Sequence, residues 1–566
     1  MNIVKRINKE IKSNGTTKVG KAKASKVKKK TTMYSSMDKR ICPNGSQMDE
    51  RVPDSNGSND AQWYARNPQL LADTASLPYN ISAGATYHLP NRAILDSTGK
   101  VIYKWLSVNP QTLSGTMTLR LRPTIGFTDS PSDPINVAAH NIYSYVRHAN
   151  SGHSNYDAPD LMLYILAVSN MMSYHSWLRR IYGTLNLFNV KNRYYPRAVI
   201  EAQLVDYDDL LANIAQFRGF INNYAVKIGS LCIPNTLDYF KRQNWLYSNI
   251  YLDKDSPTAQ SYQFAPESFY KYSEVMAAEG NTYTGGYLEH TMIDHKLTFN
   301  DIIALGNNIA DPILSSEDMN IMSGDILKAY GSEAIYKVPD TPETYTTIPV
   351  VNFEVLSQIQ NLTCLSMRPK TPGSDSMSLW GIWQQNGINE GYLVSKPSIP
   401  ANTGEAFVYD GGKVINMQMP HPSAADSMVA TRLTALVDNH AATLTTKEGK
   451  SLADKAMVEC GTEVVVAVSI AYGQTDLDTN TIKLKSTDMS LFMSYMDFKN
   501  REIMSYYFDF DWAPEIFVYI TEDGQPTKVQ RGIWDRNNIT ILHLDTLQHM
   551  NETAKLSLFA VTQMGR

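Results

Sequence analysis

Residues 157–183 read DAPDLMLYILAVSNMMSYHSWLRRIYG and predict one long helix. Asp157 can cap its start, Pro159 suits its first turn, and Gly183 marks its end. The helix is apolar almost all the way round, so it must be buried between other elements or between subunits. Its most apolar part, residues 161–172, is shorter than the ~20 apolar residues that cross a bilayer, so we expect no transmembrane helix.

The stretches on either side of this helix predict further helices and a strand. Residues 135–149 and 206–225 carry apolar residues at helical spacing. Residues 115–127, GTMTLRLRPTIGF, instead alternate apolar with polar residues, which is typical of a half-buried strand. Residues 131–335 are therefore predicted to be mostly helical.

After about residue 340 the chain changes pattern, and short strands replace helices. The predicted elements are strands at 461–473, 480–487 and 555–564, a hairpin at 515–534 that turns at 522–524, and one helix at 423–438. The fold class is therefore α+β, with a helix-rich middle followed by a β-richer part.

Composition indicates a folded protein with an unusual charge distribution. Apolar residues make up 43% of the 566 and charged residues 19%, which excludes a disordered chain. The four cysteines form no CxxC pair, so a zinc module and a disulfide scaffold are not expected, and a reducing cytosol fits best. The first residues are basic without a following apolar run, so we expect no signal peptide.

The basic residues are concentrated at the start of the chain. Of 52 basic and 56 acidic residues, the first 40 hold 13 basic and two acidic ones, a net charge of +11. The remaining 526 residues hold 39 basic and 54 acidic ones, a net charge of −15. A basic arm on an acidic body indicates a polyanionic partner for the arm.

We predict that this arm is largely disordered and binds nucleic acid through its charges. Lysine neutralises phosphates without reading bases, and Tyr34 alone could stack on one, so we expect no sequence preference. A nuclear address at residues 26–30, a merely solubilising arm, and a short helix that forms on RNA or on a membrane remain alternatives. The predicted RNA-binding residues are Lys5, Arg6, Lys9, Lys12, Lys18, Lys21, Lys23, Lys26, Lys28, Lys29, Lys30, Lys39 and Arg40.

Asp208 and Asp209, which follow Tyr207, are the most plausible catalytic pair. Polymerases hold two metal ions on adjacent aspartates in a tight hairpin between apolar strands. Here an amphipathic helix follows at once, and aspartates at a helix start stabilise its dipole and cap its free N–H groups. The capping interpretation is therefore preferred.

Other candidate sites are incomplete. His148 and His153 could bind a metal with Asp157, but they have loop spacing and no further ligand, and His290 and His295 have the same weakness. The calcium-like start at Asp476, Asp478 and Asn480 has threonine where glycine and glutamate are needed, and no glycine-rich phosphate loop or nucleophile elbow is present. We therefore predict no catalytic residue, no metal and no cofactor.

Three long strings of residues are distinctive: SPSDPINVAAHNIYSYVRHANSGHSNYDAPDLMLYILA (130–167), NDAQWYARNPQLLADTASLPYN (59–80) and residues 206–253. All three resemble one family, the capsid proteins of picobirnaviruses. The resemblance implies an icosahedral shell of capsid-protein dimers around a segmented double-stranded RNA genome, and it carries over no catalytic residue. It also implies a helical shell domain and an outward protruding domain.

Combined with the residue patterns, the resemblance predicts four segments. They are a basic, largely disordered arm (1–58), a helix-rich shell domain (59–339), a β-rich protruding domain (340–530), and a C-terminal strand segment (531–566) whose return to the shell stays open. The expected partners are further copies of the chain and sequence-independent genomic RNA. The expected location is the virion, assembled in the host cytoplasm, and contact with a host membrane during entry has no support in the sequence.

Two other classes of protein remain open. A nucleoprotein that coats RNA without a closed shell would need basic residues in the body, whose net charge is −15. A metal-dependent nucleic-acid enzyme that uses Asp208 and Asp209 would need a second acidic motif on a strand. Particle imaging of the purified protein would separate the three.

Overall fold

The computed structural model divides the chain into residues 1–60 and 61–566. All thirteen predicted RNA-binding residues fall in the first unit and lie outside the described residues. The structure describes most of residues 111–365 and 379–488, residues 510, 512 and 538–561, and short strands at 86–87, 92–95, 101–105, 518–522 and 525–529. Gaps inside these ranges include 151, 153–155, 188–194, 256–258, 275–284, 386–390, 401–411, 439–441 and 477–480.

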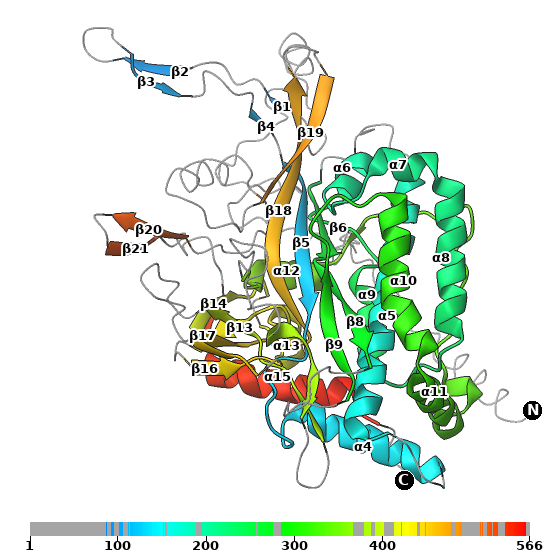
Figure 1. The fold of residues 1–566 in the computed structure, drawn as a ribbon. Coiled ribbons are helices and arrows are strands. Elements are labelled where there is room, and N and C mark those ends of the chain that lie inside the picture. Colours follow the sequence, from blue (N-terminus) through cyan, green and yellow to red (C-terminus); the bar gives the residue numbers. More distant parts are fainter. Residues whose placement is uncertain are drawn as a thin grey trace, which may run out of the picture. The chain divides into compact units, whose positions relative to one another are not determined.

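A six-stranded mixed sheet lies at the centre of the second unit. Its strand order is β10 (Val350–Val351), β6 (Tyr251–Leu252), β7 (Ser261–Pro266), β5 (Ser114–Pro123), β18 (Glu463–Asp476) and β19 (Thr481–Asp488). β5 pairs antiparallel with β18 and parallel with β7, and Figure 1 shows β18 running along β5. The strands predicted at 115–127, 461–473 and 480–487 are thus confirmed.

The prediction that β5 is half-buried is wrong. Leu119 and Leu121 are fully buried, but so are Thr118, Arg120 and Arg122, which were expected to face solvent. These side chains are buried because β5 has a neighbouring strand on each edge and other elements packed on each face. The Arg120 guanidinium reaches the Ala202 carbonyl after helix α6 (Tyr195–Glu201), and the Arg122 guanidinium lies 5.2 Å from the centre of the Trp380 ring.

The long helix predicted at 157–183 is α5 (Ala158–Leu185), with Asp157 as its N-cap and a proline in its first turn. It is buried by this chain alone, against α8 (Ile214–Gly229), α9 (Asp238–Leu246) and α10 (Phe299–Ser315). Gly183 does not end the helix. A Cβ there would lie 2.2 Å from the Thr347 hydroxyl, and Thr347 N–H donates to the Gly183 carbonyl. Because Gly183 has no side chain, the segment that contains Thr347 can pack directly against the backbone of α5.

The remaining helices of this region complete the helical layer. The helix predicted at 135–149 is α4 (Pro134–Ala149), and α11 (Glu317–Tyr330) follows α10. The helix predicted at 206–225 is two helices, α7 (Tyr207–Ala212) and α8, because the chain breaks at Asn213 (φ −109°, ψ 19°). No helix among the described residues is long and apolar enough to cross a bilayer.

Besides the central sheet, the described residues form several small sheets, some before and some after residue 340. One pairs β8 (Ser268–Ser273) with β9 (Tyr287–Met292). A second has the strand order β13 (Ser398–Pro400), β17 (Ser451–Glu459) and β15 (Leu436–Val437), and β16 (Ala442–Thr445) also pairs with β17. Others are β11 (Trp383–Gln385) with β12 (Tyr392–Val394), β14 (Gly412–Asn416) with β22 (Ile539–His543), β1 (Thr86–Tyr87) with β4 (Gln111–Thr112), and β2 (Arg92–Leu95) with β3 (Val101–Trp105). The predicted hairpin is confirmed as β20 (Val518–Glu522) and β21 (Gln525–Val529).

Two predictions after residue 340 are wrong. The helix expected at 423–438 is only α13 (Ala424–Ala430), and residues 436–437 form β15. The strand expected at 555–564 begins inside α15 (Leu544–Leu558), a helix that buries Leu547, Asn551 and Ala554 at helical spacing. The apolar–polar alternation in KLSL (555–558) is typical of a strand. The apolar residues at helical spacing over the whole of α15 nevertheless determine that this segment is helical.

The α+β class is confirmed. The four domain limits stay a prediction, and β18 and α15 bear on them. β18 comes from beyond residue 340 yet lies inside the central sheet, and α15 packs against α4 and α9 as well as β17. Both segments therefore contact elements from before residue 339.

Two buried ion pairs connect distant elements of this unit. Arg122 on β5 meets Glu267 at 2.9 Å. Arg242 on α9 meets Glu463 on β18 at 2.7 Å, and the Gln243 side chain and Thr462 hydroxyl also donate to the Glu463 carboxylate. Each charge has its counter-charge, without which burial is costly.

Candidate functional site

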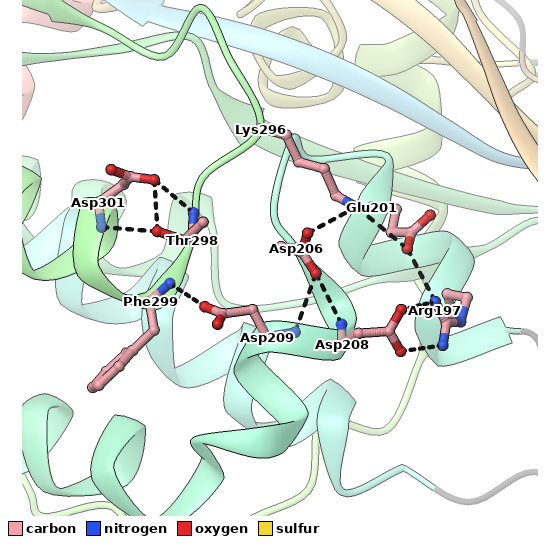
Figure 2. A network of polar contacts seen from close by, with 9 residues as sticks. All are labelled: Arg197, Glu201, Asp206, Asp208, Asp209, Lys296, Thr298, Phe299 and Asp301. Carbon is pink, nitrogen blue, oxygen red and sulfur yellow. Dashed lines mark hydrogen bonds and ion pairs between the residues drawn. The ribbon is translucent and has the colours of Figure 1, made fainter.

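The acidic cluster at the start of α7 is the site that sequence reasoning singled out (Figure 2). The residue that caps α7 is Asp206. Its carboxylate accepts hydrogen bonds from the N–H groups of Asp208 and Asp209, both at 3.1 Å. The hydrogen bond from the Asp209 N–H holds the pKa of Asp206 below its usual range, and Lys296 at 3.2 Å contributes. The prediction that Asp208 and Asp209 cap this helix is therefore wrong in that the cap is Asp206, while Asp208 and Asp209 lie in the first turn, where acidic side chains stabilise the helix dipole as predicted.

Asp208 pairs with an arginine from the preceding helix. Both of its carboxylate oxygens accept from the two terminal nitrogens of Arg197 on α6, whose guanidinium also lies 4.6 Å from the centre of the Tyr207 ring. The hydrogen bond from Arg197 lowers the pKa of Asp208. Because the side chain of Asp208 is 67% exposed, this pair contributes little to stability.

Asp209 contacts a different helix. Its Oδ2 accepts from the Phe299 N–H at 2.6 Å, at the first turn of α10. That turn has its own capping box, in which Thr298 and Asp301 satisfy each other's backbone N–H groups. Asp209 therefore fastens the start of α7 to the start of α10.

The two aspartates do not converge on a common point. Asp208 is directed to Arg197 and Asp209 to Phe299, as Figure 2 shows. Two-metal catalysis needs both carboxylates on the same ions. Within the described part of the chain, no group of three His, Cys, Asp or Glu side chains could hold a metal. The cluster connects the start of α7 to α6 through Asp208 and to the start of α10 through Asp209.

The histidine candidates are likewise separate from one another. His148 is exposed on α4, Asp157 caps α5, and His153 lies outside the described residues. His290 is half-buried, and its ring nitrogens contact the Ser268 hydroxyl and the Trp380 carbonyl, both at 2.9 Å. Burial and nearby Arg122 lower the pKa of His290 to about 3, so it is neutral at physiological pH.

The other rejected motifs lie at exposed positions, in turns, or partly outside the described residues. His295 is exposed and pairs with its neighbour Asp294 at 2.7 Å. Asp476 ends β18, and Asp478 and Asn480 lie outside the described residues, in the segment that connects to β19. The Gly-Lys-Ser sequence at 449–451 lacks the upstream glycine of a phosphate loop. Its Gly449 has φ +75° in the tight turn between β16 and β17, where the Gly449 N–H donates to the Thr446 carbonyl.

The chain matches one protein-family model, described as picobirnavirus capsid protein, over residues 63–506. The chain belongs to the picobirnavirus capsid protein family. This capsid protein is 30% identical to the capsid protein precursor of human picobirnavirus over 532 residues, 90% of this chain and 92% of that protein. As a capsid protein, it is a structural component of the virion.

The fold of the capsid protein agrees with a solved structure. It superposes on the crystal structure of the picobirnavirus capsid with a TM-score of 0.69 and 23% sequence identity, covering 89% of this chain and 98% of that one. The shared fold extends through both the helix-rich and the β-richer parts. In a structural protein, the acidic cluster at α7 is understood as a joint between helices.

We predict that replacing Asp209 by alanine destabilises the capsid protein by about 1–2 kcal/mol. The Phe299 N–H then loses its acceptor at a helix start, and such losses are of this size. Urea unfolding of the full chain measures the change. Asp208→Asn is the matched control, because it removes an adjacent exposed charge and should cost less than about 1 kcal/mol. Equal effects would contradict the assignment of separate partners.

Proposed function

We propose that this protein assembles through dimers into a closed icosahedral shell that encloses double-stranded RNA. The family membership over residues 63–506 carries the proposal. The match of nearly the whole length to a capsid protein precursor supports it. We further propose that assembly takes place in the host cytoplasm.

The basic arm, residues 1–40, is proposed to hold the RNA. It carries a net charge of +11 while the rest of the chain carries −15, so RNA should prefer the arm to any other surface. The binding residues are the thirteen lysines and arginines named above. With so few aromatics, binding should follow charge and salt, not base sequence.

The outward projection is proposed to come from residues 340–530, apart from β18. Antibodies and proteases should reach intact particles mainly there, because exposed loops carry variation and contacts. β18 is excepted because β5 and β19 flank it in the central sheet.

We predict that a chain starting at residue 41 folds and assembles but packages much less RNA. If the full arm engages about ten phosphates, the log–log salt slope of RNA binding should be near −9, and the truncated chain should lose most of it. The measurements are particle imaging, the ultraviolet absorbance ratio of purified shells, and RNA binding at several salt concentrations.

The control replaces Glu10 and Asp38 by glutamine and asparagine, which keeps the arm and raises its charge. This variant should package at least as much RNA as the native chain. Equal RNA in full-length and truncated shells would refute the role of the arm. RNA-coated strands without closed shells would instead support a nucleoprotein.

A further inference from the structure

The two-stranded ribbon β14–β22 leaves one of its strand edges open. Its register pairs Val414 with Ile541 and Asn416 with Ile539. The neighbouring pair of Met417 with Asn538 is hydrogen-bonded, since the Met417 N–H donates to the Asn538 carbonyl at 2.8 Å. Antiparallel pairs alternate between bonded and non-bonded, so Ile539 and Ile541 are in non-bonded pairs. Their N–H and C=O groups therefore point away from β14.

The opposite edge of the ribbon is closed at Asn416. The outward N–H and C=O of Asn416 on β14 both bond to the side chain of Asn361, each at 2.8 Å. Asn361 is the last residue of α12 (Phe353–Asn361). On β22 the described residues supply no such partner, so the backbone groups of Ile539 and Ile541 and the N–H of His543 are open. The His543 carbonyl lies at the N-cap of α15 and is excluded from this count.

The side chains of the open strand are apolar and exposed. Ile541 is 59% exposed and Ile539 45% exposed, and Val414 lies beside Ile541 on the same face. The opposite face of the ribbon is buried, with Ile415 and Leu542 in a cluster with Leu547. Soluble proteins normally protect such an edge with lysine, proline or another charge, and Ile539–His543 contains no Lys, Arg, Asp, Glu or Pro.

We propose that β22 pairs edge to edge with β22 of a second copy of this chain across a two-fold axis. The inference rests on the proposed function, because it identifies a contact between copies in the assembled shell. Family membership favours a second copy as the occupant, because this chain belongs to the picobirnavirus capsid protein family and its fold matches a solved capsid. Identical bodies of net charge −15 repel each other, so a contact between copies is best made through a surface without acidic side chains. β22 has exposed isoleucines and contains no Lys, Arg, Asp or Glu.

The two-fold axis fixes the orientation and the register. An isologous contact turns the second strand antiparallel, and each residue meets its symmetry counterpart. The outward groups overlap most when Ile541 faces Ile541 of the second copy and Ile539 faces His543. The Ile541 pair then makes two backbone hydrogen bonds, and each His543 N–H adds one to an Ile539 carbonyl. A continuous sheet of β14, β22 and their two symmetry copies results, in the manner of strand addition.

Cysteine cross-linking in the full-length chain tests the register. In a hydrogen-bonded antiparallel pair the Cα atoms lie ~5.5 Å apart, which a disulfide can span. Ile541→Cys should therefore give a single covalent dimer on a non-reducing gel after mild oxidation. The control is Ile348→Cys, at an isoleucine that is 70% exposed elsewhere on the body and should stay monomeric.

A charge at the axis tests the energetics. Ile541→Lys places two lysines opposite each other and should raise the dimer dissociation constant at least tenfold in analytical ultracentrifugation. Ile348→Lys should change it less than threefold. Thermal unfolding of both variants shows that the lysine at an exposed position leaves the body folded.

The outcomes separate the inference from the proposed function. If native chains form shells while Ile541→Cys gives no dimer, or Ile541→Lys associates like the native chain, the edge pairing is wrong and the capsid function stands. A ladder of larger covalent species would also contradict a closed two-fold contact. If native chains form neither dimers nor shells, both proposals fail.

Discussion

A chain that ends at residue 339 is expected to have no cooperative unfolding transition. The truncation removes β18, the strand that pairs with β5 from Pro123 to Ser114. β5 would then lose the backbone hydrogen bonds to β18, and the hydrophobic core around β5 would be exposed to water. A domain has only about 5–15 kcal/mol of net stability, and the loss of a central strand exceeds it. Near-ultraviolet circular dichroism and thermal scans measure the result.

The matched control supplies residues 340–566 as a separate chain. Co-expression should restore a soluble complex with a sharp transition, because the missing strand and its contacts return. A truncated chain that melts cooperatively by itself would instead show that residues 59–339 form an independent domain, as the sequence pattern predicts.

The second large effect is expected for Arg242→Ala. Arg242 makes three hydrogen bonds to the Glu463 carboxylate, and Glu463 is fully buried. Removing one partner of a buried pair leaves an uncompensated charge and costs about 3–5 kcal/mol. Lys241→Ala on the same helix is the control. Its exposed pair with Asp238 should be worth less than about 1 kcal/mol in the free energy of unfolding.

The pH dependence of unfolding gives a second readout. Burial alone raises the pKa of Glu463, but the charge and hydrogen bonds of Arg242, together with Arg432 and Thr462, outweigh it and lower the pKa. A lowered carboxyl pKa contributes stability above the ordinary value near 4.5, which is lost as pH falls through the folded pKa. In Arg242→Ala this contribution should shrink or reverse, so urea unfolding between pH 3 and 7 should show a flatter acid limb. An unchanged limb would contradict the assignment.

Local signals predicted the individual elements well. α5 follows from the cap at Asp157, the proline after it and the apolar composition, and β5 follows from its alternation. The burial of Arg120 and Arg122 could not be predicted, because their partners come from Ala202, Glu267 and Trp380. Such pairings bring together residues that are far apart in the sequence, and local periodicity carries no information on which distant residues meet.

The candidate site shows the same limit. Helix-capping chemistry at residues 206–209 was predictable from the aspartates and the helix that follows. The bond from Phe299 to Asp209 spans ninety positions, and no local pattern signals it. Gly183 misled the prediction for a related reason, since its small size serves Thr347 rather than a helix end.

The position of β18 also has a consequence for how the protein is made. Glu463 pairs with Pro123, so β5 leaves the ribosome 340 positions before its antiparallel partner does. At 5–20 residues per second, that delay lasts about 17–70 s. Until β18 has been translated, the edge of β5 that pairs with it has no partner strand, and the central sheet is incomplete. A complete central sheet therefore exists only after residues 463–476 have been translated, so the core of this unit closes late in synthesis.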